Sequence, residues 1–242
     1  MIRVKAKMIN WTELNTIVSV RHGDRLSTAS RCRHLIMTAI TTGALPPGER
    51  LIEADLGHAL NVSRTPLREA LAALKAEGVL HHDSDGLRIR QLGWHDIHDL
   101  YEMRSTLEGM AARGAAEKSS AAEKSVINSI ATTEARLIER GDEPDKLAQH
   151  NSRFHRAILQ AAQNPFLIDA LNRLSHLLVL LGTTAYSLPR RVSSIEGEHH
   201  AINMAIQSGD GDGAEAAMKT HLSNALTARL ELLSISDQQD MD

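Results

Sequence analysis

The sequence contains very little cysteine and few aromatic side chains. Its 242 residues include one cysteine, Cys32, which excludes a disulfide framework and a zinc site built from cysteines. Aromatic residues make up 2% of the chain, whereas hydrophobic residues as a whole make up 42%. The core must therefore consist mainly of Leu, Ile, Ala, Val and Met, and this composition favours packed helices over a β-sandwich.

Long apolar segments are also missing. The most apolar stretch covers only residues 177–181, whereas a membrane-spanning helix needs about 20 apolar residues. The first eleven residues include basic side chains but no continuous apolar segment of the kind found in signal peptides. We therefore expect a cytoplasmic protein without a membrane partner.

The charge of the chain is small in total but unevenly distributed. The formal net charge is −3. Residues 1–92 carry 13 Lys and Arg against 9 Asp and Glu, whereas residues 93–242 carry 14 against 21. A basic first third joined to an acidic remainder indicates that the first third meets a polyanion.

Apolar spacing predicts three helices and a β-hairpin within residues 27–92. A first helix ends at Gly43, a short second one precedes Asn61, and a third covers residues 64–77. Two short extended segments follow, joined by Asp85-Gly86, which is a strong hairpin signal. Residues 1–26 show no sustained period, so we expect a flexible tail there.

The remainder of the chain is expected to be an all-α bundle. Residues 93–236 show helical spacing almost throughout, interrupted by Asn164-Pro165 and by the glycine-rich segment 209–213. The expected helices are 94–118, 120–140, 143–163, 166–186, 190–208 and 213–235. The fold class predicted for the whole chain is mainly α, with an N-terminal winged helix-turn-helix and a C-terminal helical bundle.

The start of the helix at residues 64–77 has the chemistry of a DNA-reading helix. Arg64 and Arg68 are one turn apart, on the side opposite the apolar stripe. An arginine can bind guanine through O6 and N7 or clamp a phosphate. Pro66 suits a first helical turn, and the free N–H groups there suit a phosphate. Arginines in such positions are often ordinary solvated residues, so this pattern alone leaves both interpretations open.

The surrounding sequence resembles a known DNA-binding family. The segment GALPPGERLIEADLGHALNVSRTPLREALAALKAEGVL, within residues 27–92, closely resembles the N-terminal domain of the GntR family of bacterial regulators. The resemblance implies that Ser63, Arg64, Thr65 and Arg68 contact DNA and that the wing tip at Gly86 enters the minor groove. The chain departs from some family members at residues 53–55, where Glu-Ala-Asp replaces an arginine-bearing segment.

Three expected helices of the second half place a histidine on or beside an apolar stripe. These histidines are His155, His199 and His221, and Asn151 precedes His155 by one turn. A single histidine in such a position is usually a satisfied core residue. Burying several unpaired imidazoles costs roughly 1–3 kcal/mol for each unsatisfied group, and a shared divalent cation would satisfy all of them. Three imidazoles suit zinc or nickel.

This second half also resembles a known module, the FCD effector domain of FadR-like members of the GntR family. The matching segments are YEMRSTLEGMAAR, NSRFHRAI, EHHAINMAIQSGD and THL, across about residues 96–222. The resemblance implies a divalent metal held by Asn151, His155, His199 and His221. Asn151 stands where many members have an aspartate, which makes the site less negative. His200 is out of register with the ligands.

Arg104 interrupts the apolar stripe of the helix expected at 94–118. Its partner is either Glu108, one turn further on, or an anion from outside the chain. The family resemblance implies that Arg104 faces the effector pocket and binds a carboxylate, so a small organic acid or sugar acid is the expected effector.

These features together predict a ligand-responsive transcription regulator rather than an enzyme. We expect a homodimer that binds double-stranded DNA at a palindromic operator and acts as a repressor. Two alternatives remain at this point. A metal-dependent hydrolase would use three histidines and an open metal position, but neither HExxH nor a general base stands beside the cluster. A constitutive DNA-binding protein would use the second domain only to dimerise.

Overall fold

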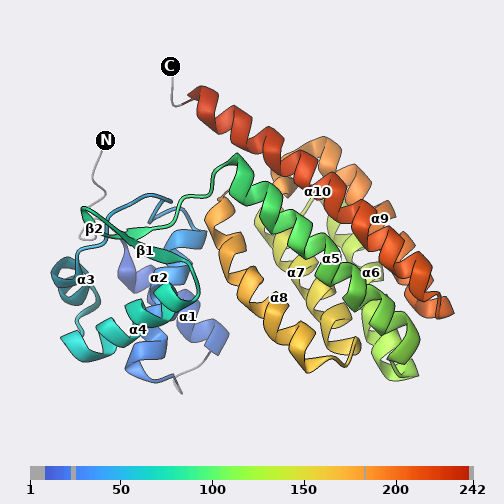
Figure 1. The fold of residues 1–242 in the computed structure, drawn as a ribbon, viewed down its shortest axis with the longest axis horizontal. Helices are drawn as coiled ribbons and strands as arrows, with labels where there is room; N and C mark the ends of the chain where they lie inside the picture. Colours follow the sequence, from blue (N-terminus) through green and yellow to red (C-terminus); the bar gives the residue numbers. More distant parts are fainter. Residues whose placement is uncertain (1–8, 23–25, 183, 240–242) are drawn as a thin grey trace. The chain divides into compact units, whose positions relative to one another are not determined.

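The computed structural model describes residues 9–22, 26–182 and 184–239. The chain is mainly helical and forms two compact units (Figure 1). The first unit contains residues 1–92 together with residues 175–182, and the second contains residues 93–174 together with residues 183–242. This mainly α architecture confirms the predicted fold class.

The first unit is a winged helix-turn-helix. Its helices are α1 (Trp11–His22), α2 (Thr28–Thr41), α3 (Glu53–Leu60) and α4 (Arg64–Ala76), and its strands are β1 (Leu80–Asp83) and β2 (Gly86–Ile89). Asn61 closes α3 in the left-handed conformation, with φ of 51°, and Ser63 is the N-cap of α4. The apolar face of α4 is buried, so the arginines of its first turn remain on the outer face.

Helix α1 lies where the sequence analysis expected a flexible tail, and that prediction is wrong for residues 11–22. Trp11, Leu14 and Val18 are buried, and α1 packs against α2. Arg31 of α2 also donates a hydrogen bond to Asn15 at 2.9 Å. The helix is short and weakly amphipathic, so its apolar residues show little period by themselves, and packing on α2 stabilises it. Residues 1–8 and 23–25 of the expected tail lie outside the described residues.

The wing is a two-stranded antiparallel sheet in which Leu80 pairs with Ile89 and Asp83 with Gly86. Gly86 has φ of +125°, a backbone conformation that side-chain-bearing residues rarely adopt, so glycine is required at this tip. Residues 48–51 run along the other edge of β2, since Leu51 donates to the carbonyl of Leu87 at 2.8 Å.

The second unit is a bundle of helices. They are α5 (Trp94–Lys118), α6 (Ala121–Glu139), α7 (Pro144–Ala161), α8 (Pro165–Leu177), α9 (Pro189–Ser208) and α10 (Gly211–Gln239). The last turn of α8 is assigned to the first unit. The helix expected at 166–186 is shorter than predicted. It ends at Leu177 and is followed by the 3₁₀ helices η3 (Leu178–Leu181) and η4 (Ala185–Ser187). Gly182, with φ of 69° and ψ of −132°, cannot continue a helix.

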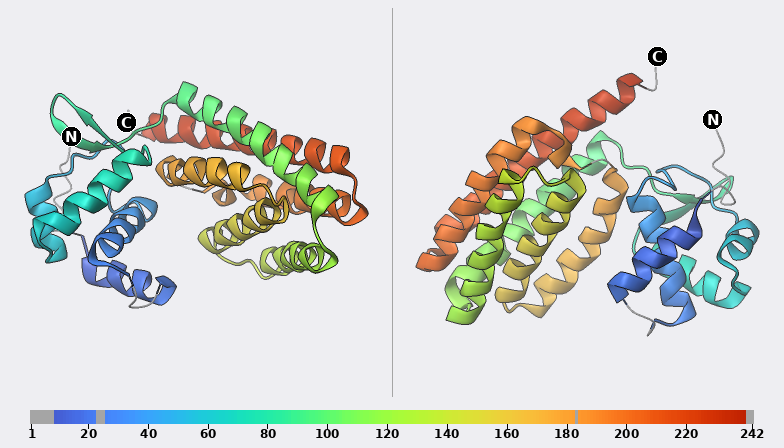
Figure 2. Two further views of the ribbon diagram at one scale, coloured as in Figure 1. Left: turned by 60° about the horizontal axis from the view of Figure 1, so that its bottom comes forward. Right: turned by 180° about the vertical axis from the view of Figure 1, so that it is seen from behind.

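Helices α5 and α10 lie side by side along much of their length (Figure 2). The main core of the bundle combines small alanines of α5 with larger side chains such as Phe154, Ile202 and Met218. Small residues let the helices approach closely: a Cβ added at Gly114 would lie 3.2 Å from the Cβ of Ala162. Helices α5 to α10 all contribute buried side chains to this core.

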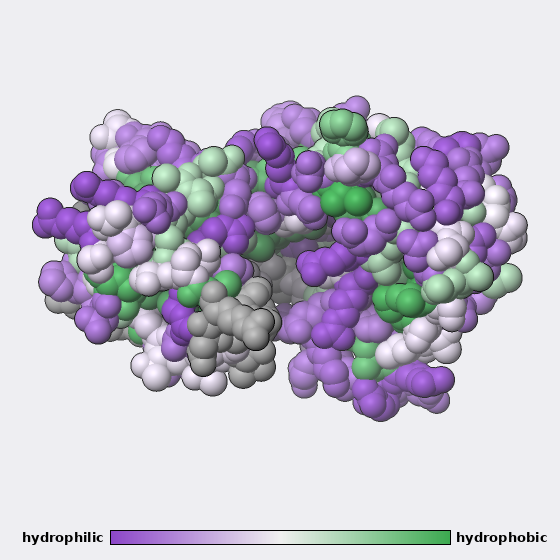
Figure 3. Space-filling model, turned by 90° about the horizontal axis from the view of Figure 1, so that it is seen from below, coloured by the Kyte–Doolittle hydropathy of each residue, from purple (hydrophilic) through white to green (hydrophobic). Residues whose placement is uncertain are grey.

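The face shown in Figure 3 is largely hydrophilic, and its hydrophobic residues form small separate groups. Within the described ranges, no helix has both the length and the hydropathy needed to cross a membrane.

Candidate metal centre and DNA-binding surface

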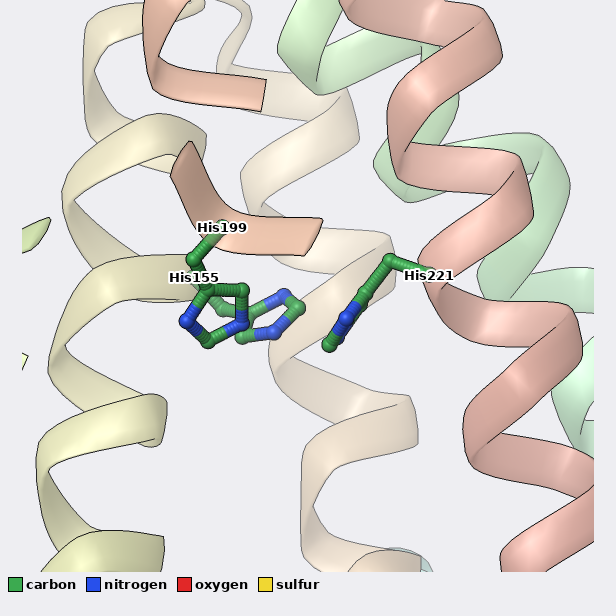
Figure 4. A group of neighbouring side chains, drawn as sticks. All are labelled: His155, His199 and His221. Atoms are coloured by element: carbon green, nitrogen blue, oxygen red, sulfur yellow. The ribbon is translucent and has the colours of Figure 1, made fainter. Parts of the chain in front are cut away.

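Three histidines from three helices meet inside the second unit. His155 comes from α7, His199 from α9 and His221 from α10, and their imidazoles converge (Figure 4). The ring centroids of His199 and His221 are 4.7 Å apart, and those of His155 and His221 are 5.1 Å apart. One ligand nitrogen from each side chain lies within 4.8 Å of the other two. The three positions singled out in the sequence therefore form one cluster.

Each of these histidines is hydrogen-bonded to a different glutamate through Nδ1. The distances are 2.5 Å from His155 to Glu108, 2.6 Å from His199 to Glu134 and 2.8 Å from His221 to Glu198. An ionised carboxylate can only accept, so an imidazole held in this way carries a proton on Nδ1 and donates it. This arrangement leaves the lone pair of Nε2 available on all three rings. Carboxylates hold metal-binding histidines in other proteins in the same way.

The free nitrogens show that the cluster fits a metal ion. Nε2 of His155 and Nε2 of His199 are buried and have no hydrogen-bond partner among the described residues. A buried acceptor without a partner is costly in a folded protein, whereas a divalent cation would bind both nitrogens. The buried triad could therefore hold a metal, and an all-imidazole set suits zinc or nickel.

Glu108 connects the cluster to Arg104. Arg104 donates from Nε to Glu108 at 2.8 Å, and its guanidinium lies 4.8 Å from the ring centroid of Tyr101. All three residues are on α5 and are buried. Burial by itself would raise the pKa of Glu108, but the charge of Arg104 and the contact with His155 outweigh it and lower that pKa. Glu108, one of the two partners considered for Arg104 in the sequence, is the one found in this structure.

Glu134 holds His199 from α6. Its other oxygen accepts a hydrogen bond from the Tyr186 hydroxyl at 2.9 Å, and the side chains of Glu134 and His199 are each 1% exposed. Burial acts to raise the pKa of Glu134, and the hydrogen bonds from His199 and Tyr186 lower it overall. Glu134 is therefore a carboxylate that stays ionised although it is almost completely buried from solvent.

Glu198 holds His221 and is paired with Arg191. Arg191 donates to Glu198 at 2.6 Å, and Asn224 donates to the same oxygen at 2.8 Å. Although burial opposes it, the bonds from His221, Arg191 and Asn224 lower the pKa of Glu198 to about 2. Burial lowers the pKa of His221 to about 3 and also lowers that of His199. Both of these rings are therefore neutral near pH 7, as a metal ligand must be.

Asn151, the fourth predicted ligand, and His200, which the sequence analysis set aside, differ in their exposure to solvent. Asn151 is half-buried on α7, one turn before His155. His200 is exposed, although it follows His199 directly.

Sequence reasoning missed several of the supporting residues, namely Glu134, Glu198, Arg191 and Tyr186. Glu134 and Arg191 are charged residues on otherwise apolar stripes, which is the signal that identified the histidines.

The residues expected to read DNA are exposed at the start of α4. Ser63, Arg64, Thr65 and Arg68 are all solvent-accessible. Ser63 makes no side-chain capping bond, so its hydroxyl is available to a phosphate. Arg68 donates from Nε to Glu53, the first residue of α3, at 2.9 Å. Glu53 belongs to the segment that departs from the family pattern, and it contacts one of the predicted reading residues.

A winged helix-turn-helix followed by a helical bundle with a buried histidine cluster defines a DNA-binding regulator with a sensory domain. Residues 28–85 match the family of bacterial regulatory proteins named gntR, and residues 99–224 match the FCD domain. The chain belongs to the GntR family and carries the C-terminal FCD domain of its FadR-like subgroup. This family consists of transcriptional regulators, not enzymes, which confirms the resemblance found in the sequence and excludes the hydrolase alternative.

Individual relatives support the same assignment. The chain is 31% identical over 206 residues to a probable D-xylose utilization operon transcriptional repressor of Paenarthrobacter nicotinovorans, covering 84% of this chain and 89% of the relative. It is 32% identical over 222 residues to a putative L-lactate dehydrogenase operon regulatory protein of Escherichia coli, covering 81% and 82%.

Among solved structures, McbR/YncC of Escherichia coli has a similar fold. Its TM-score is 0.72 at 21% sequence identity, and the match covers 86% of this chain and 99% of that one.

Proposed function

We propose that this chain is a metal-containing, acid-responsive repressor that binds a palindromic operator as a homodimer in the cytoplasm. The observation that carries the proposal is the convergence of three buried histidines, each held by a glutamate, in the sensory domain of a DNA-binding regulator. One recognition helix reads only a few base pairs, so two copies on a two-fold site are needed for useful specificity.

The proposed metal ligands are His155, His199 and His221 through Nε2, with the amide oxygen of Asn151 as a fourth, neutral ligand. Zinc and nickel are the ions that this donor set favours. A bound ion would act as a Lewis acid toward an oxygen atom of the effector. The protein supplies the orientation of the rings, because each Nδ1 is fixed by its own carboxylate.

The proposed effector is a small organic or sugar acid, with Arg104 as the anchor of its carboxylate. The hydrogen bond to Glu108 uses Nε of Arg104, so the two terminal nitrogens lie outside that bond and have the fork geometry that suits a carboxylate. The names of two relatives, which refer to L-lactate dehydrogenase and D-xylose utilization operons, support an effector from hydroxy-acid or sugar metabolism.

The signal is proposed to leave the sensory domain through α5. Arg104 and Glu108 are on α5, and only residues 90–93 separate this helix from β2 in the sequence. An effector changes DNA affinity only by binding one form of the dimer more tightly. A tenfold change requires about 1.4 kcal/mol of differential affinity.

Metal analysis of the full chain, purified without a chelator or a histidine tag, tests the proposal. We expect about one divalent ion per chain and its loss from the variant His155→Ala/His199→Ala/His221→Ala. The variant His200→Ala is the matched control, because it removes an exposed histidine next to His199 and should keep the ion.

DNA binding of the same proteins then tests whether the regulator responds to ligands. Operator affinity should change when a small acid is added to the metal-loaded parent protein but not when it is added to the triple variant. Affinity that stays the same with and without metal and acids would overturn the proposal in favour of a domain that only dimerises.

A further inference from the structure

The three glutamates that hold the histidines differ in their second partner. Glu108 is paired with Arg104, and Glu198 is paired with Arg191. Glu134 instead accepts from the neutral hydroxyl of Tyr186. Among the described residues, neither a lysine nor an arginine forms an ion pair with Glu134. The one ion pair that Glu134 makes within these residues is with His199.

The consequence is an uneven distribution of charge around the cluster. The proposed ligands are three imidazoles and one amide, none of which is negative. The guanidinium groups of Arg104 and Arg191 compensate two of the surrounding carboxylates. Of the three glutamates, only Glu134 has neither an arginine nor a lysine as an ion-pair partner among the described residues, and its side chain is 1% exposed.

An ionised carboxylate that is buried without a positive partner destabilises the folded protein. Transfer of an ionised group out of water costs free energy that must be recovered from a nearby positive charge. Hydrogen bonds from His199 and Tyr186 recover part of this free energy, but both donors are neutral groups. A divalent cation on Nε2 of His199 would lie across one imidazole ring from Glu134, close enough for a strong interaction in a medium from which water is excluded.

We infer that Glu134 is the positioning residue that supplies the metal centre with the negative charge absent from its ligands, and that Tyr186 fixes Glu134 in place. Glu134 thereby fulfils the electrostatic role that a carboxylate ligand would have at the position of Asn151. It also holds His199 with Nδ1 protonated and Nε2 facing the ion. This inference rests on the proposed metal site.

The variant Glu134→Gln tests the inference, because it keeps the size of the side chain and removes its charge. We expect zinc and nickel affinity, measured by competition with a chromogenic chelator, to fall about 10–100-fold. This is the usual loss of metal affinity when a residue that holds a metal ligand is substituted. The variant Glu139→Gln removes the same charge from an exposed position on the same helix and should bind metal like the parent protein. Unchanged affinity in Glu134→Gln would overturn the inference.

A second substitution separates the charge from the hydrogen bond. Asn151→Asp, combined with Glu134→Gln, places the negative charge directly in the ligand set and should restore most of the lost affinity. Failure to restore it would overturn the role assigned to the charge. Tyr186→Phe keeps the charge and removes one hydrogen bond, so its loss should be smaller than that of Glu134→Gln, and an equal or larger loss would also count against that role.

The parent protein provides a test that needs no substitution. In the metal-free protein near pH 7, ¹⁵N NMR should show His199 protonated at Nδ1 and bare at Nε2, and a proton on Nε2 would overturn the inference. The outcomes also separate the two proposals. A parent protein that binds neither zinc nor nickel overturns the proposed metal site itself, whereas a parent that binds and a Glu134→Gln variant that binds equally well overturn only the role of Glu134.

Discussion

Nδ1 of His155 donates a hydrogen bond to Glu108 across 2.5 Å, which joins a histidine of α7 to a carboxylate of α5. The other oxygen of Glu108 accepts from Arg104, the proposed anchor of the effector. Any ligand that draws Arg104 away from Glu108 therefore alters the support of a proposed metal ligand. By linkage, such an effector and the metal must influence each other's affinity equally.

Arg104→Ala is expected to weaken binding of acidic effectors about 10–100-fold, since hydrogen bonds to charged groups contribute about 1.5–3 kcal/mol. A thermal-shift screen of small organic and sugar acids identifies ligands, and calorimetry compares their affinities for parent and variant. Arg136→Ala removes an exposed arginine from α6 and serves as the control. The anchor is misassigned if the ligands bind Arg104→Ala as tightly as the parent, and the acid class is wrong if only neutral compounds stabilise the protein.

Metal removal is expected to lower the thermal stability of the protein. A ligand at 100 times its dissociation constant adds about 2.7 kcal/mol to the free energy of unfolding, which corresponds to roughly 5–10 °C in Tm for a chain of this size. Differential scanning calorimetry of the metal-free protein, with and without excess zinc or nickel, measures the shift. His200→Ala should show the same shift as the parent, and the triple histidine variant should show none. Equal melting temperatures of the parent under both conditions would count against the metal site.

The metal-free protein is expected to lose stability as the pH falls from about 6.5 toward 3. Burial holds the pKa of His221 at about 3, whereas in the unfolded chain it is about 6.5. The unfolded state therefore binds the proton first, so the free energy of unfolding decreases through this window. For His221 the loss between pH 7 and pH 5 is about 2 kcal/mol.

Chemical denaturation of the metal-free parent and of His221→Asn, at a series of pH values, measures this dependence. The slope should be smaller in His221→Asn, whereas His200→Asn should keep the slope of the parent because His200 is exposed. Identical slopes in all three proteins would show that His221 does not titrate differently on unfolding.

Arg64→Ala and Arg68→Ala are each expected to cost about 1–3 kcal/mol of specific DNA binding, the usual value of a bidentate contact to a base. Electrophoretic shifts with a library of genomic fragments measure affinity and selectivity together. Lys75→Ala removes an exposed positive charge from the last turn of the same helix and should leave selectivity unchanged. Unaltered selectivity in both arginine variants would remove these residues from the reading surface.

Glu53→Gln provides a further test of this surface. Glu53 accepts a hydrogen bond from Nε of Arg68, and the terminal nitrogens of Arg68 lie outside that bond and can contact a base. The substitution should therefore reduce discrimination less than Arg68→Ala does. A larger reduction would assign the reading role to Glu53 instead.

Several features of this protein could be predicted from the sequence because they depend on local spacing. Helical period, caps and the Asp85-Gly86 turn marked the winged helix-turn-helix, and the resemblance to the GntR motif predicted which residues read DNA. His155, His199 and His221 could be singled out because each interrupts an apolar face, and burial of polar side chains is costly wherever they lie. Helix α1 was missed because its stability comes from packing on α2.

The sequence by itself determined the family, the helical class and the three histidines, since periodicity and motif are properties of neighbouring residues. Only the tertiary structure decided which carboxylate meets which ring. Glu134 and His199 are 65 positions apart, and Glu108 and His155 are 47 apart. Helix packing brings such pairs together, and one sequence contains no spacing rule for contacts between separate helices. The same packing left Glu134 beside a tyrosine while it placed arginines beside Glu108 and Glu198.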